Sequence, residues 1–153
     1  MLRAELGEFS SIVCFKAAIT GMEEALGEKA TAIALIAAGR SRGKNLAKEL
    51  GLTGASIKWA VIADKMDFAL GVNGTRLCKI QNIVEESDVI KVSTLETLAS
   101  ANEPEGSARK CTYTLGAVWG VLEEITGKRL KGTHTESVLR GGSSDVFEFA
   151  PLV

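Results

Sequence analysis

Residues that form crosslinks or bind metal ions are scarce in this sequence. The 153 residues include one histidine and three cysteines, Cys14, Cys78 and Cys111, which are widely spaced and form no CxxC pair. An odd number of scattered cysteines argues against a disulfide framework and is typical of a reducing compartment. Only two residues are proline and 46% are hydrophobic, which excludes a disordered or low-complexity chain. We expect residues 1–153 to form a single domain.

An excess of one charge and long apolar runs are missing as well. Eighteen basic residues balance nineteen acidic ones, and the densest basic cluster, Arg40, Arg42 and Lys44, holds only three charges. Nucleic-acid binders usually carry a basic excess or stripe, so we expect no nucleic-acid partner. The longest apolar-rich stretch, Ala30–Ala38, is far shorter than the roughly 20 residues of a membrane helix. The N-terminus has no signal-peptide pattern. These absences predict a cytoplasmic protein without a membrane span.

Hydrophobic periodicity predicts four helices and two β-hairpins. The predicted helices are Ser10–Leu26, Glu28–Leu50 (one helix, or two with a bend), Ser56–Leu70 and Lys110–Thr126, and the predicted strands are Arg76–Glu85, Val89–Leu98, Lys131–Leu139 and Asp145–Phe149. This order lacks a regular βαβ alternation and predicts the α+β class, with an antiparallel sheet packed against several helices.

Apolar and small residues on two predicted helices suggest close packing. Phe15, Ile19, Met22 and Leu26 form a stripe on the first helix, which we expect to pack against the domain or a second subunit. Gly39 and Gly43 lie four residues apart on the second helix, which favours tight helix packing over approach by a ligand.

Catalytic motifs are absent from the chain. There is no phosphate-binding GxxxxGK[ST] loop and no GxGxxG dinucleotide fingerprint. The only histidine, His134, falls on a polar predicted strand, where we expect it to face solvent. The pairs Glu23–Glu24 and Glu123–Glu124 are expected on solvated helix faces. We therefore expect no catalytic residues and no cofactor.

Several aromatic residues could line an apolar pocket, which is the usual character of a small-ligand site. The candidates are Trp59, Met66, Phe68 and Trp119, and filling of the core is the alternative role for each of them. Arg40 is a candidate to bind an acidic ligand group, and it is equally plausible as a surface charge.

Two stretches together resemble the 4-vinyl-reductase-type domain, also called the hydrocarbon-binding domain. The first is AAGRSRGKNLAKELG, residues 37–51, which is similar to the family's Gly-Arg-Gly helix. The second is CTYTLGAVWGVLEEITGKRLKGTHTESVLRGGSSDVFEF, residues 111–149, which resembles the closing unit of the family. In that unit a cysteine opens a helix with spaced glycines, and a two-stranded hairpin follows and ends in an aromatic residue. The middle third of the chain carries no signature.

The resemblance implies an α+β domain that commonly dimerises and encloses an apolar ligand cavity. Members sense small aromatic or hydrocarbon molecules, relatives occur in bacteriochlorophyll synthesis, and the fold is shared with subunits of the TRAPP vesicle-tethering complex. We expect a non-catalytic module that binds an apolar small molecule or has a regulatory role. We expect it to act as a homodimer that forms through its helical surface. The alternatives are an interaction scaffold or assembly factor analogous to TRAPP subunits, and an accessory protein in tetrapyrrole or pigment synthesis.

The resemblance also implies a metal site that this chain has altered. Sensor members bind zinc through a cysteine, a glutamate and two further cysteines. Cys111 and Glu136 match the first two, whereas Leu139 and Phe147 stand at the other two positions. Because structural zinc is almost always four-coordinate, we expect no metal here. Apolar packing of Leu139 and Phe147 is expected to hold the hairpin to the helix instead.

Overall fold

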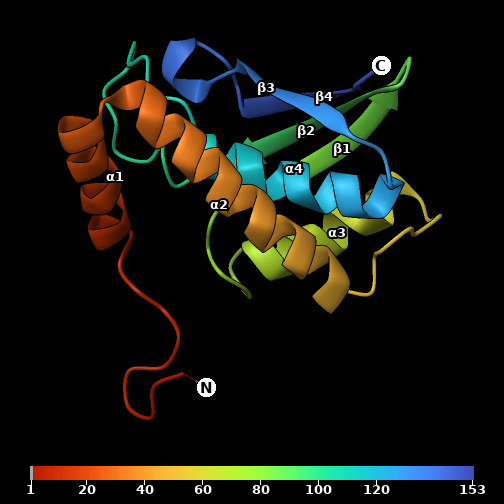
Figure 1. The fold of residues 1–153 in the computed structure, drawn as a ribbon, viewed down its shortest axis with the longest axis horizontal. Helices are drawn as coiled ribbons and strands as arrows, with labels where there is room; N and C mark the ends of the chain where they lie inside the picture. The colour runs from red at the N-terminus through yellow and green to blue at the C-terminus, as the bar shows by residue number, and fades with distance from the viewer. Residues whose placement is uncertain (1) are drawn as a thin grey trace.

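Four helices and a four-stranded sheet make up the fold (Figure 1). The computed structural model describes residues 2–153. In chain order the elements are α1 (Ile12–Leu26), α2 (Glu28–Glu49), α3 (Trp59–Leu70), β1 (Lys79–Glu86), β2 (Val89–Leu95), α4 (Thr112–Thr126), β3 (Leu130–Glu136), a short 3-10 helix (Val138–Arg140) and β4 (Asp145–Pro151). The predicted α+β class with an antiparallel sheet is confirmed.

The sheet joins the two hairpins through their second strands. Its order is β1-β2-β4-β3, and every neighbouring pair is antiparallel. Val92 of β2 lies opposite Phe147 of β4 at the centre of the sheet. Val92, Phe147 and Phe149 are fully buried, since they belong to the hydrophobic core that the sheet shares with the helices.

Several predicted ends of helices and strands were wrong for reasons of backbone conformation. Arg76 and Glu96 both have positive φ, 58° and 49°, which an extended strand does not adopt. As a result β1 begins only at Lys79 and β2 ends at Leu95. Helix α3 begins at Trp59 rather than at Ser56 because the residue before it is still extended.

Helices α2 and α4 pack backbone to backbone through four glycines. A Cβ atom on Gly39 or Gly43 would overlap carbonyl oxygens of α4, and one on Gly116 or Gly120 would overlap carbonyl oxygens of α2. Glycine is therefore needed at all four positions for the helices to approach this closely. The predicted tight packing at Gly39 and Gly43 is confirmed, and α2 is one continuous helix.

The N-terminal region lies apart from this core (Figure 1). The segment before α1 runs away from the sheet, and α1 stands against one end of α2. Ile19 is the one residue of α1 that is buried. None of the helices in residues 2–153 is long and apolar enough to cross a membrane.

Candidate functional site

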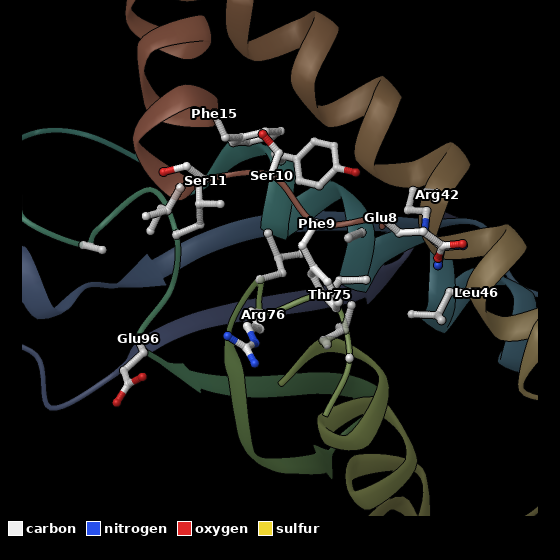
Figure 2. A pocket seen from close by; sticks show the side chains of 18 of the residues that line it. Glu8, Phe9, Ser10, Ser11, Phe15, Arg42, Leu46, Thr75, Arg76 and Glu96 are labelled. Carbon is white, nitrogen blue, oxygen red and sulfur yellow. The ribbon is translucent and has the colours of Figure 1, made fainter. Parts of the chain in front are cut away.

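A large cleft lies beside the N-terminal region. Its volume is about 1280 Å³, and its walls come from the N-terminal segment and α1, from α2, from the end of α3 and the turn after it, from the segment after β2 and from α4 (Figure 2). The lining residues are Leu2, Glu8–Ile12, Phe15, Arg42, Gly43, Leu46, Leu70, Asn73–Leu77, Glu96, Leu98, Ala101, Tyr113 and Ala117.

The floor of the cleft is apolar and its rim is polar. Leu46, Leu70 and Leu77 contribute buried side chains from three separate segments. Arg76 and Glu96 contribute charged side chains that are exposed. An apolar molecule would therefore lose contact with water at the floor, while a polar group of the same molecule could stay at the rim.

Aromatic contacts hold the N-terminal wall of the cleft in place. The ring of Phe15 on α1 meets that of Tyr113 on α4 edge to face, with 5.3 Å between their centroids. The guanidinium group of Arg76 lies 5.6 Å from the ring centroid of Phe9. Ser11 caps α1 by accepting a hydrogen bond of 3.1 Å from the Val13 N–H group. This wall is attached by a few contacts at its edges, in contrast to the packed α2–α4 pair.

The five residues predicted to contact a ligand do not line this cleft. Three of them lie on α3, where Met66 is fully buried, Phe68 is 63% exposed and Trp59 donates a 2.7 Å hydrogen bond to Glu85. The other two meet elsewhere, since the Arg40 guanidinium lies 4.6 Å from the Trp119 ring centroid. The predicted stripe on α1 was the signal that could have found Phe15.

Arg40 and Trp119 belong to a polar cluster around Glu123. The Glu123 carboxylate accepts hydrogen bonds from Arg40 at 2.8 Å, from the Trp119 indole at 3.1 Å and from the Leu130 backbone at 3.0 Å. Burial opposes ionisation, but the Leu130 N–H group and Arg40 outweigh it and lower the pKa of Glu123. The prediction that Glu123 faces solvent was wrong, because this carboxylate joins α2, α4 and β3.

A second polar cluster is buried at the start of α4. Cys111, at the N-cap position of the helix, lies beside His134 of β3 and Asp145 of β4. His134 Nε2 is 3.3 Å from Asp145 Oδ1, and both side chains are only 1% exposed. Ser100 Oγ lies 3.1 Å from Cys111 Sγ and donates a 2.9 Å hydrogen bond to Asp145 Oδ2. The structure thus brings together three residues that are far apart in the sequence.

Burial governs the ionisation of this second cluster. It raises the pKa of Cys111 to about 12 and that of Cys78 also to about 12. Burial acts in the same direction on Asp145, but contacts with His134, Ser100 and Ser137 outweigh it, so that the Asp145 pKa lies below its usual range. The three cysteines are free thiols, and Cys14 is the exposed one.

A β-bulge decides which β3 residue reaches Cys111. His134 pairs with Phe147 and Glu136 pairs with Val146, so that the register shifts between them. A bulge re-aims the side chains beyond it. His134, which precedes the bulge, lies on the same inward face as Leu130 and is buried, whereas Glu136 beyond the bulge is exposed. The prediction that His134 faces solvent was wrong, because regular alternation from the buried Leu130 places His134 on the inward face of β3.

Thiol, imidazole and carboxylate groups are the donors that zinc-type ions use in proteins. The ligand atoms of Cys111, His134 and Asp145 all lie within 4.8 Å of one another. Leu139 and Phe147 are buried as expected, and Glu136 is outside this group. The chain therefore has a donor set that fits a metal ion, but two of its members are residues that the family pattern did not mark.

No protein-family model and no curated protein matches this sequence. Solved structures do resemble it. The phenol-responsive sensory domain of the transcription activator PoxR, with phenol, aligns with a TM-score of 0.71 and 12% identity over 94% of this chain and 76% of that one. The chain shares the fold of this sensory domain.

Two further structures have this fold. Trafficking protein particle complex subunit 3 from Naegleria fowleri, covalently bound to palmitic acid, aligns with a TM-score of 0.63 and 15% identity over 93% of each chain. A vinyl-4-reductase family protein from Methanocaldococcus jannaschii aligns with a TM-score of 0.52 and 18% identity over 97% of this chain and 86% of that one. The predicted resemblance to the 4-vinyl-reductase-type domain and to TRAPP subunits is confirmed at the level of the fold.

Proposed function

We propose that this protein is a non-catalytic module that binds a small apolar molecule in the cleft beneath its N-terminal segment. The observation that carries this proposal is the cleft itself, whose volume of about 1280 Å³ and apolar floor suit a hydrophobic ligand. Sites for small molecules are typically concave and mostly apolar, and this cleft is somewhat larger than their usual volume of roughly 300–1,000 Å³. The polar rim, with Arg76 and Glu96, would orient a ligand that carries one polar group.

The ligands of two structural neighbours support the choice of an apolar molecule. One neighbour is described with phenol and the other with covalently bound palmitic acid. Both ligands combine an apolar body with one polar end, which is the pattern of the floor and rim described above. A regulatory role follows if binding repositions α1, because Phe15 of α1 forms part of the cleft wall.

Calorimetric titration with phenol, a long-chain alkylphenol and palmitate tests this proposal. We expect at least one of them to bind, and Ala101→Trp to weaken its binding by about tenfold or more because the new ring fills the cleft. Ala60→Trp is the matched control, since Ala60 is exposed on α3 and does not line the cleft. Failure of all three probes to bind, or equal binding by both variants, would contradict the proposal.

We further propose that the module works as a homodimer through its helical surface. Phe9, Ile12, Val13 and Leu26 expose large apolar side chains on and beside α1. Exposed apolar side chains can mark a protein interface, and Val13 and Leu26 are the two of these that do not line the cleft. Sedimentation analysis should show a dimer that Val13→Glu converts to a monomer, and a monomeric wild type would refute this part.

The same exposed residues favour a second candidate function, an interaction scaffold. In that case α1 would bind another protein, and the cleft would be structural. Affinity purification from the host should then return one defined partner, and its recovery should be lost with Val13→Glu but unaffected by Ala101→Trp.

A further inference from the structure

A small hollow adjoins the cleft, and two residues line both spaces. The hollow has a volume of about 210 Å³ and is lined by Gly71, Val72, Arg76, Cys78, Lys79 and Glu96. Arg76 and Glu96 also line the cleft, so they stand where the two spaces meet. The hollow is smaller than a typical site for a whole small molecule. It suits one end group of a ligand whose body lies in the cleft.

Arg76 is the arginine of the cleft that lacks a carboxylate partner. The other cleft arginine, Arg42, donates hydrogen bonds of 3.0 and 3.3 Å to the Glu49 carboxylate. Arg40, which the sequence predicted to bind an acidic ligand group, donates to Glu123 at 2.8 Å and does not line the cleft. Arg76 forms no ion pair within residues 2–153. Its guanidinium group is therefore the cationic group of the cleft that remains available for an anion.

The surroundings of this guanidinium group favour a carboxylate. Its Cζ atom lies over the Phe9 ring, 5.6 Å from the centroid, and a ring on one face leaves the N–H donors in the guanidinium plane accessible. Such donors bind a carboxylate through two parallel hydrogen bonds. Lys79 is exposed and adds a second positive charge to the hollow. Glu96 is the one acidic residue among those that line the hollow, and its side chain points away from Arg76 (Figure 2).

The turn after α3 fixes Arg76 at this junction. Arg76 has a φ of 58°, which costs a non-glycine residue free energy and persists only where neighbouring contacts impose it. Here the Arg76 N–H group donates to the Gly71 carbonyl oxygen at 3.1 Å, and the Leu77 N–H group donates to that of Leu70 at 2.8 Å. The backbone that carries the guanidinium group is thus ordered before a ligand binds, which lowers the entropic cost of binding.

We propose that the ligand of the cleft is an amphiphile with a carboxylate end, which Arg76 binds and Lys79 attracts. Its hydrocarbon chain lies on the apolar floor formed by Leu46 and Leu70. This inference rests on the proposed function, to which it adds the chemical class of the ligand and its orientation in the cleft.

Calorimetric titration with decanoate and 1-decanol tests the inference, because the two compounds share a ten-carbon chain and differ in the end group. We expect decanoate to bind about tenfold more tightly or better, and acetate, which has no chain, not to bind detectably. If 1-decanol bound as tightly as decanoate, the apolar cleft would stand and the carboxylate preference would be refuted. If acetate bound as tightly as decanoate, the ligand would not be an amphiphile. If neither ten-carbon compound bound, the proposed function itself would fail, and this inference with it.

Variants show whether Arg76 recognises the acidic end. Arg76→Gln should weaken decanoate binding by about tenfold or more and remove the preference over 1-decanol. Lys79→Gln should have a smaller effect, about threefold, because an exposed charge is screened by solvent. Arg129→Gln is the matched control, since it removes the same charge from an exposed arginine that lines neither space, and decanoate should bind it as it binds the wild type.

Binding of 1-decanol reports whether the Arg76→Gln cleft is intact. We expect the affinity for 1-decanol to change by about threefold at most, because an alcohol carries no charge for the guanidinium group to bind. Equal losses for decanoate and 1-decanol would mean that Arg76 supports the cleft wall and does not recognise the acid. That result, or unchanged decanoate binding in Arg76→Gln, would overturn the proposal.

Discussion

Helices α1 and α4 have the same length and similar apolar stripes, yet the protein uses them in opposite ways. Each has fifteen residues, but ten residues of α4 are buried, whereas only Ile19 of α1 is. Helix α4 lies between α2 and the sheet, and its glycines allow α2 to approach its backbone. Helix α1 meets the domain along one side only. An apolar stripe therefore shows that a helix is amphipathic, but it does not show how much of the helix is covered.

The two helices are also attached by different forces. Helix α1 is joined to the loop before α4 by ion pairs of 2.8 Å, Lys16 with Glu103 and Arg109 with Glu23. Helix α4 is held by close packing and by the buried Glu123 carboxylate. Ion pairs near the surface contribute little, whereas close packing in a core contributes most of the stability of a domain. We expect α1 to open before α4 does.

The largest expected effect is that of a side chain added between α2 and α4. Gly120→Val places a Cβ against the Arg40 carbonyl oxygen, so that α2 and α4 must move apart and lose their close packing. We expect a loss of about 3 kcal/mol or more in the free energy of unfolding, measured with urea.

The matched control for this substitution lies on α1. A Cβ at Gly21 meets no atom within 4 Å, so Gly21→Ala should be neutral or stabilise by roughly 0.5–1 kcal/mol. Similar destabilisation by both substitutions would show that the two helices do not differ as described.

An intermediate effect is expected from Glu123→Gln. The amide can no longer form the ion pair with Arg40, so the buried cluster should lose about 1–3 kcal/mol at neutral pH. Because folding lowers the Glu123 pKa, the stability from ionisation is present above the ordinary glutamate range and is lost as pH falls towards the lowered value. The variant should consequently lose less stability on acidification.

Urea unfolding at several pH values measures this difference. Glu24→Gln on α1 is the control, since Glu24 is exposed, and its stability curve should follow that of the wild type. If the stability of Glu123→Gln fell with pH in parallel with that of the wild type, the ionised Glu123 carboxylate would not have the stabilising role assigned to it.

The smallest structural perturbation comes from labelling thiols with iodoacetamide. Cys14 on α1 is exposed and should react in the native protein, with little effect on stability. Cys78 and Cys111 are buried with pKa values of about 12, so they should react only after unfolding. Mass spectrometry of peptides gives the order of labelling, and early modification of Cys111 would mean that the start of α4 is open.

The pattern of the sequence predicted the elements better than their contacts. Helix α4 and the glycines of α2 were predicted correctly because periodicity and small residues reflect local geometry. The strands were predicted to extend over Arg76 and Glu96 because arginine and glutamate are not residue types that indicate a positive φ. The residues that line the cleft were not predicted because they come from several separate parts of the chain, and no single stretch carries their signal.

The sequence by itself determined the α+β class, the element order and the resemblance in fold, since these depend on local periodicity and spacing. Tertiary structure alone decided which polar residues are buried. Glu123 and His134 are on a helix and a strand that look solvated in the sequence, but Arg40 of α2 covers the first, and the second lies on the inward face of β3 opposite Phe147 of β4. The burial of a side chain depends on the residues that pack against it, and for Glu123 and His134 these residues are distant in the chain.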